Sequence, residues 1–154
     1  MCKLYSLLIM VLAPLAALLA QPTIIVDNGS ACTGEAFCVA VTSQDFTNIN
    51  SLDFDFGYDP AVLNFTGAQN FNVDMQSDGT LGPALFDNTT PGVISFGTWE
   101  TGNGDCLDIS NLGTTLADDV DVLFELCFEA IGTYGEQTTI GINPFPTPNV
   151  TRNS

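Results

Sequence analysis

The sequence predicts an all-β protein folded as a sandwich of about eight to nine strands in two sheets. Two observations carry this prediction. Short runs of alternating apolar and polar residues recur along the chain, and Gly, Asn, Asp and Pro interrupt them at regular intervals. These runs are rich in Phe, Val, Ile and Thr, whereas almost no stretch after residue 20 shows helical periodicity. The length of 154 residues fits one domain.

The alternating runs place the strands in chain order. Strands are predicted at 23–27, 36–43, 51–58, 62–68, 83–87, 92–99, 120–131 and 137–142. Residues 101–119 are expected to form a long loop, with one short helical turn near 106–112. We assign 21–143 to the sandwich. The segment 144–154 has no packing pattern, so it is either a Pro-rich tail or the start of a truncated final strand.

The N-terminus predicts export. Lys3 precedes an apolar run from Leu4 to Ala20 that small residues close, which is the pattern of a signal peptide over residues 1–20, cleaved near Ala20. A membrane anchor is the weaker alternative, because the run of about 17 residues is short for a span and contains Pro14. We therefore expect a secreted or cell-surface protein whose mature chain does not insert into a membrane.

The charge balance excludes some partners. The chain has 18 acidic residues against two basic ones, a net charge of −16. Such a surface repels nucleic acid and anionic membranes. It suits cations, neutral ligands such as sugars, or a basic protein. The alternative is that the charge serves only solubility in a salty medium, where it is screened.

The stretch "SLDFDFGYDPAVLNF", residues 51–65, has acidic residues at alternate positions, as a calcium loop does. It also has Leu52 and three aromatic residues between the acids, and a loop that curls around an ion would not place them there. A strand with an inward aromatic face and an outward acidic face fits better. Asp59 and Pro60 then end this strand in a turn that the Asp59 side chain is expected to cap.

Four cysteines lie beyond the signal segment: Cys32, Cys38, Cys106 and Cys127. An even number in an exported chain indicates two disulfides, for which three pairings exist. A zinc site is disfavoured, because the chain has no histidine and no cysteine pair at zinc-ligand spacing.

Three stretches together resemble cohesin domains. The first is "GEAFCVAVTSQDFTNINSLDFDFGYDPAVLNFTGA", and the others are "GVISFGTWETGNG" and "VDVLFELCFEAIGTYGEQTTIGI". The likeness covers most of residues 23–142. The pattern "FCV…YDPAVL…LFELCFEA" is especially similar to cohesin-like modules in large secreted proteins of the Bacteroidetes. Carbohydrate-binding sandwich modules share the fold and parts of the pattern.

The resemblance implies a jelly-roll sandwich of about nine strands. It implies a non-catalytic module that docks a partner, typically a calcium-loaded dockerin, in polysaccharide-degrading assemblies. The partner would lie on the sheet that contains strand 51–58. The outward residues carried over from the family are Ser51, Asp53, Asp55, Gly57, Gly97, Trp99 and Glu100.

The resemblance also bears on the cysteines and the C-terminus. In the family fold, the strands that carry Cys38 and Cys127 are antiparallel neighbours, which implies a Cys38–Cys127 disulfide and leaves Cys32 to pair with Cys106. The four cysteines are not general to cohesins, although "FCV" and "LCF" are similar to the Bacteroidetes group. The last strand of the family has no evident counterpart before Ser154, so it is expected to be missing.

Trp99 is the single tryptophan, and the sequence allows two interpretations of its side chain, exposed or covered. Strict alternation turns Ile94, Phe96 and Thr98 inward and Trp99 outward. An exposed indole would stack on a sugar or anchor a protein partner. In the other reading, loop 101–110 covers it. Carbohydrate binding through Trp99 is therefore one alternative to docking, and a structural spacer in a surface adhesin is another.

Signals for metals and catalysis are weak. A calcium ion could bind Asp118, Asp119 and Asp121, although such acids are more often a solvated strand entry, and no other cofactor is expected. Beyond the signal segment the chain has no histidine or lysine, and no carboxylate pair stands in the context of a glycosidase. We therefore expect a protein that is not an enzyme.

Overall fold

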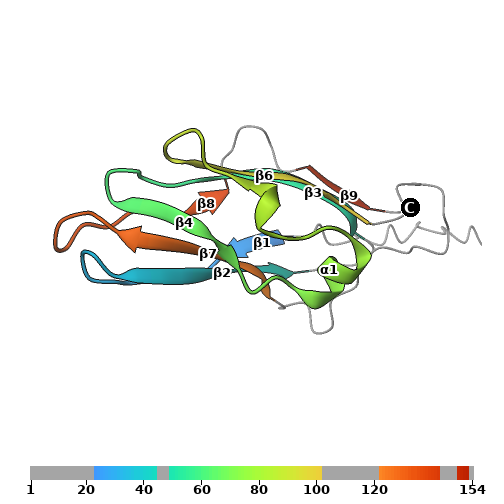
Figure 1. Ribbon diagram of the computed structural model, residues 1–154, viewed down its shortest axis with the longest axis horizontal. Helices are drawn as coiled ribbons and strands as arrows, with labels where there is room; N and C mark the ends of the chain where they lie inside the picture. The colour runs from blue at the N-terminus through green and yellow to red at the C-terminus, as the bar shows by residue number, and fades with distance from the viewer. Residues whose placement is uncertain (1–22, 45–48, 102–121, 143–148, 153–154) are drawn as a thin grey trace, which may run out of the picture.

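The computed structural model describes residues 23–44, 49–101, 122–142 and 149–152, which form two antiparallel sheets packed face to face (Figure 1). The first sheet has the order β1-β2-β7-β4, made of β1 (Thr23–Val26), β2 (Ala36–Gln44), β7 (Val122–Ala130) and β4 (Leu63–Gln69). The all-β sandwich predicted from the sequence is confirmed.

The second sheet has the order β5-β6-β3-β8, made of β5 (Phe86–Asp87), β6 (Val93–Glu100), β3 (Ile49–Gly57) and β8 (Gly141–Ile142). A further strand, β9 (Asn149–Arg152), pairs with the first half of β3, whereas β8 pairs with its last two residues. β9 lies within 144–154, the segment for which the sequence left a tail and a strand as alternatives.

The strands with strong alternation lie where the sequence placed them, and the short ones differ. The stretch predicted as strand 83–87 begins with a 3-10 turn, Pro83–Leu85, and only its last two residues form β5. Of the predicted strand 137–142, only Gly141 and Ile142 are strand. The helical turn expected near 106–112 lies outside the described residues.

The core lies between the two sheets and is largely aromatic. Phe54, Phe96 and Phe124 form a line across it, with ring centroids 5.0 Å apart between the first two and 5.4 Å between the last two. The first two belong to the second sheet and Phe124 to the first, so these contacts join the layers. Each ring is fully buried, which contributes on the order of 1.5–3 kcal/mol per side chain.

A short helix, α1 (Val73–Asp78), closes one end of the sandwich (Figure 1). The Asn72 side chain caps the helix by accepting hydrogen bonds from Asp74 N at 3.0 Å and Met75 N at 3.2 Å. Met75 is fully buried and attaches the helix to the core.

Candidate functional site

The outer face of the second sheet is the surface on which the resemblance to cohesins implies a partner. Alternation along β3 buries Leu52, Phe54 and Phe56 and leaves Asp53 exposed and Asp55 half-buried on the other side. The outward residues of β3 and β6 on this face are, apart from Val93, small or acidic: Ser51, Asp53, Asp55, Gly57, Val93, Ser95, Gly97, Thr98 and Glu100. We call this surface the acidic face.

A β-bulge shapes the middle of the acidic face. Leu52 pairs with Trp99 and Phe54 with Phe96, so Gly97 and Thr98 together stand opposite Asp53. Both residues of the bulge are exposed. The Thr98 hydroxyl donates to Asp53 Oδ2 at 3.4 Å, which links the bulge to the central acid. The sequence placed Thr98 inward, and a glycine within a strand was the available signal for the bulge.

The same bulge corrects the prediction for Trp99. The extra residue reverses the alternation after Phe96, so Trp99 points into the core and is 0% exposed. Its indole Nε1 donates to the carbonyl of Met75 in α1 at 3.0 Å. A Cβ at Gly79 would overlap the indole, so the glycine lets the chain after α1 close over it. Trp99 is therefore a core residue and not part of an exposed binding face.

One row of polar residues crosses the acidic face. Ser95 pairs with Asp55 of β3 on one side and with Asp87 of β5 on the other. Asp87 Oδ1 also accepts from Thr89 N at 3.0 Å, which holds the turn after β5. No lysine or arginine stands in β3, β5 or β6, so this face is electronegative. Asp87 and Ser95 were not among the predicted contact residues.

At one end of the acidic face, Glu100 of β6 is exposed and pairs with Ser51 of β3, which pairs in turn with Thr151 of β9.

At the other end of the acidic face, β3 ends and the chain enters the turn at Asp59 and Pro60. Asp59 Oδ1 accepts a hydrogen bond from Ala61 N at 2.9 Å, and the Asp59 carbonyl accepts from Leu63 N at 3.0 Å. This side-chain cap fixes the corner between β3 and β4.

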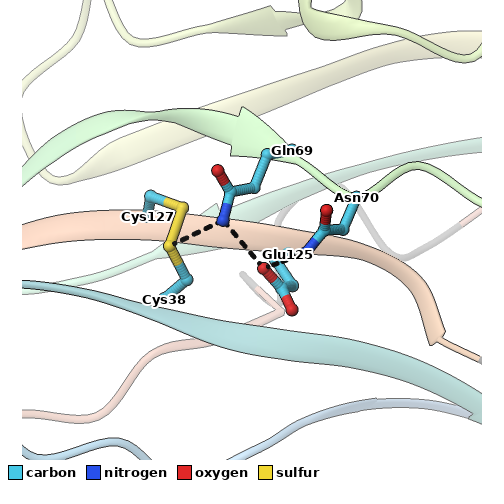
Figure 2. The surroundings of a disulfide bond; sticks show 5 residues. All are labelled: Cys38, Gln69, Asn70, Glu125 and Cys127. Atoms are coloured by element: carbon cyan, nitrogen blue, oxygen red, sulfur yellow. Dashed lines mark hydrogen bonds between the residues drawn. A yellow bond between two sulfur atoms is a disulfide. The ribbon is translucent and has the colours of Figure 1, made fainter.

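The opposite sheet carries a disulfide on its outer side. Cys38 of β2 and Cys127 of β7 face each other in register and are joined, the pairing that the resemblance implied. Figure 2 shows Gln69 beside the bond, its Nε2 donating to Cys38 Sγ at 3.3 Å and to Glu125 Oε2 at 3.0 Å. Asn70 Nδ2 donates to the same Glu125 oxygen at 2.8 Å.

The second predicted disulfide and the predicted calcium site lie partly or wholly outside the described residues. Cys32 is exposed and forms no disulfide with any described residue, and Cys106 lies outside the described residues, so their pairing stays a prediction. The calcium candidates Asp118, Asp119 and Asp121 also lie outside them. Within the described part of the chain, no three side chains of the metal-binding types gather at one point.

A cavity of about 520 Å³ lies at the end of the sandwich where the segments before β2 and after β7 meet. Its only carboxylates come from Asp27 and Glu136, and Glu136 accepts a hydrogen bond from Thr133 N at 2.6 Å. Thr33 Oγ1 donates to the Gly132 carbonyl at 2.7 Å and ties the two segments together. The cavity is therefore lined by turns that are held together by these hydrogen bonds.

No family model and no curated protein matches this chain, whereas solved structures do. The sixth cohesin of scaffoldin B from Acetivibrio cellulolyticus, in complex with a mutant Cel5 dockerin, has TM-score 0.62 and 14% identity, over 87% of this chain and 88% of that one. The solution structure of CaCohA2 from Clostridium acetobutylicum has TM-score 0.61 and 18% identity, over 85% and 79% of the two chains.

A third match is the type I cohesin–dockerin complex Coh-OlpA–Doc918 from Clostridium thermocellum, with TM-score 0.59 and 15% identity, over 87% of this chain and 88% of that one. The chain therefore has the fold of cohesin domains, a jelly-roll sandwich. The resemblance noted in the sequence is confirmed at the level of the fold. No helix among the described residues is long and apolar enough to cross a membrane.

Proposed function

We propose that this protein is a non-catalytic docking module that binds a dockerin-type protein through the acidic face. The observation that carries the proposal is the combination of the cohesin fold with a sheet face whose outward residues, apart from Val93, are small or acidic. Two of the structural matches, from Acetivibrio cellulolyticus and Clostridium thermocellum, were solved with dockerins bound.

The charges of the acidic face indicate the chemistry of the partner. Asp53, Asp55, Asp87 and Glu100 lie on β3, β5 and β6, which contain no lysine or arginine, and the basic residue of the neighbouring strand β9, Arg152, pairs with Ile49 at the start of β3. A partner surface with lysine or arginine would complement this field, and the charges would act mainly on association rate and selectivity.

The structure gives little support to carbohydrate binding at this face. That alternative depended on an exposed Trp99, and the indole is buried with its N–H bonded to Met75. Among the described residues of β3, β5 and β6, no large aromatic side chain is exposed. A sugar-binding shelf needs such a ring, because stacking on an apolar face supplies much of the binding energy.

We further propose that the module works outside the cell. The N-terminal apolar run and the Cys38–Cys127 disulfide support this, because disulfides persist in oxidising compartments. Membership in a polysaccharide-degrading or cell-surface assembly is part of the same proposal.

The proposal is tested by titrating the oxidised domain with a panel of purified dockerin modules, in calcium and in EDTA. We expect calcium-dependent binding that weakens as salt concentration rises. Asp53→Asn combined with Asp55→Asn should weaken it by about tenfold or more, since each side chain contacts solvent on the acidic face.

Glu129→Gln, on the outer side of the other sheet, is the matched control for removal of a charge. It should bind like the parent protein. The proposal is wrong if no dockerin binds, or if the double Asp variant and the control bind equally well.

A further inference from the structure

The cavity lies outside the acidic face. Its two walls are the connection from β1 to β2 and the chain that follows β7, and Figure 1 shows both at the end of the sandwich opposite α1. None of the residues that line it belongs to β3, β5 or β6. Its volume of about 520 Å³ is in the range of sites that bind small molecules.

The cavity combines an apolar floor with polar walls. Phe37, Val62 and Leu63 line it and are buried or half-buried, in contact with the core of the sandwich. Most of the exposed side chains that line it carry a hydroxyl or an amide group: Asn28, Ser30, Thr33, Thr133, Gln137 and Thr139. A few polar groups around an apolar surface are typical of a ligand site.

The walls are fixed, whereas several of their side chains are free to bind a ligand. Gly34 N donates to the Ala130 carbonyl at 2.7 Å, which joins the two walls by a backbone hydrogen bond. The side chains of Asn28, Ser30 and Gln137 form no hydrogen bond within the described part of the chain. The site therefore has hydrogen-bonding groups in place whose partners are not supplied by the fold.

A tyrosine lies at the edge of the cavity. The Thr133 carbonyl accepts from Glu136 N at 3.1 Å, which closes a four-residue turn, and the φ of +88° at Gly135 fits the third position of a type II turn. Tyr134 occupies the second position and is the most exposed large hydrophobic side chain among the described residues. Its ring adds nothing to the core, and the turn holds it beside the cavity.

The charges of the site favour a neutral ligand. Asp27 and Glu136 line the cavity and no lysine or arginine does, so an anion would be repelled. A metal ion needs more ligands, and Glu136 already accepts from Thr133 N. A saccharide matches the remaining groups, because its hydroxyls pair with amides and hydroxyls while the apolar face of its ring stacks on an aromatic side chain.

We propose that this cavity binds a short neutral saccharide. The ring of Tyr134 stacks on one sugar unit, and the amide groups of Asn28 and Gln137 and the hydroxyl of Ser30 bond to the sugar hydroxyls. This site goes beyond the proposed docking function and does not depend on it, since the two surfaces share no residue.

The first arm of the test is titration calorimetry of the oxidised domain with four neutral probes: cellopentaose, xylopentaose, mannopentaose and chitopentaose. At least one should bind with a dissociation constant of about 1 mM or tighter. Pentagalacturonic acid is the anionic control and should not bind. Failure of all four neutral probes, or binding of the anionic control as tight as theirs, overturns the proposal.

The second arm changes the tyrosine. Tyr134→Ala should weaken binding of the best probe by about tenfold or more, whereas Tyr134→Phe, which keeps the ring, should stay within about threefold of the parent. Neither change should move the unfolding temperature, because the side chain is exposed. Val73→Ala, which shortens another exposed apolar side chain at the opposite end of the sandwich, is the matched control and should bind normally. Equal binding by Tyr134→Ala and the parent overturns the assignment.

The third arm separates this site from the acidic face. Asp53→Asn combined with Asp55→Asn should bind the probe as the parent does, and Tyr134→Ala should still bind a dockerin that the parent binds. Loss of saccharide binding in the double Asp variant would place the sugar on the acidic face and overturn the cavity as its site.

Discussion

At the scale of single residues, the burial of Trp99 removes the exposed ring on which the carbohydrate-binding alternative depended. An exposed tryptophan on this strand would have pointed to sugar or to an apolar anchor for a partner. Instead, the indole is fully buried and its N–H is bonded to Met75 in α1. The side chain therefore stabilises the end of the sandwich and leaves the acidic face without an aromatic group.

The environment of Trp99 predicts both spectroscopy and stability. As the single tryptophan, it should emit at short wavelength and resist acrylamide quenching until the protein unfolds. Trp99→Ala should cost about 3–5 kcal/mol of unfolding free energy, measured by urea denaturation followed by circular dichroism. Trp99→Phe, which keeps a ring but loses the bond to Met75, should cost about 1–3 kcal/mol. Strong quenching in the folded parent would contradict this account.

At the same scale, the sequence identified the outward residues of β3, and on β6 it identified Gly97 and Glu100 but placed Thr98 and Trp99 on the wrong sides. Ser51, Asp53 and Asp55 alternate regularly with large apolar residues, and this pattern predicts that they lie on the outer face of the sheet. Beyond Phe96, one extra residue opposite Asp53 reverses the sides of Thr98 and Trp99. Alternation cannot reveal such a bulge, because the bulge depends on how two strands pair.

At the scale of elements, the long strands could be predicted and the short elements could not. β2, β3 and β7 each have nine residues, enough for the alternation to be unambiguous. β5 and β8 have two residues each and are defined by their pairing with β6 and β3. α1 has only six residues, so its periodicity is too short to distinguish from a turn.

The cap of α1 gives a prediction at this scale. Asn72→Ala removes the acceptor for the N–H groups of Asp74 and Met75 and should destabilise the domain by about 1 kcal/mol. Because α1 covers Trp99, the variant should also make the indole more accessible to acrylamide in the folded state. Gln76→Ala, at an exposed position of the same helix, is the control and should be neutral. Equal quenching in the parent and in Asn72→Ala would show that the cap of α1 does not contribute to the burial of Trp99.

At the scale of the whole molecule, the net charge of −16 opposes folding by self-repulsion. Sodium chloride screens these charges, so the unfolding temperature should rise with salt concentration in the range where the Debye length falls below the spacing of the charges. Scanning calorimetry of the mature domain across a salt series tests this. An unfolding temperature that does not change with salt would show that the repulsion is negligible.

The disulfide also acts on the whole molecule. It joins β2 to β7 across 89 residues of sequence, so it restricts the unfolded chain strongly. Replacing Cys38 and Cys127 together by alanine should lower the unfolding free energy by about 2–5 kcal/mol, measured by urea denaturation. Gln69→Ala, which removes the amide beside the bond but keeps the disulfide, should have a much smaller effect. A similar loss in both variants would argue against the cross-link as the source of stability.

The same cross-link has a mechanical consequence for a protein that is pulled from both ends. Tension entering at β1 and β9 reaches the covalent bridge between β2 and β7 before it can act along the chain between them. The segment between Cys38 and Cys127 contains β3 and β6, and its extended length of roughly 300 Å cannot be pulled out while the disulfide is intact. Under stretching, the outer strands can peel away while the strands that carry Asp53, Asp55 and Gly97 stay inside a closed covalent ring.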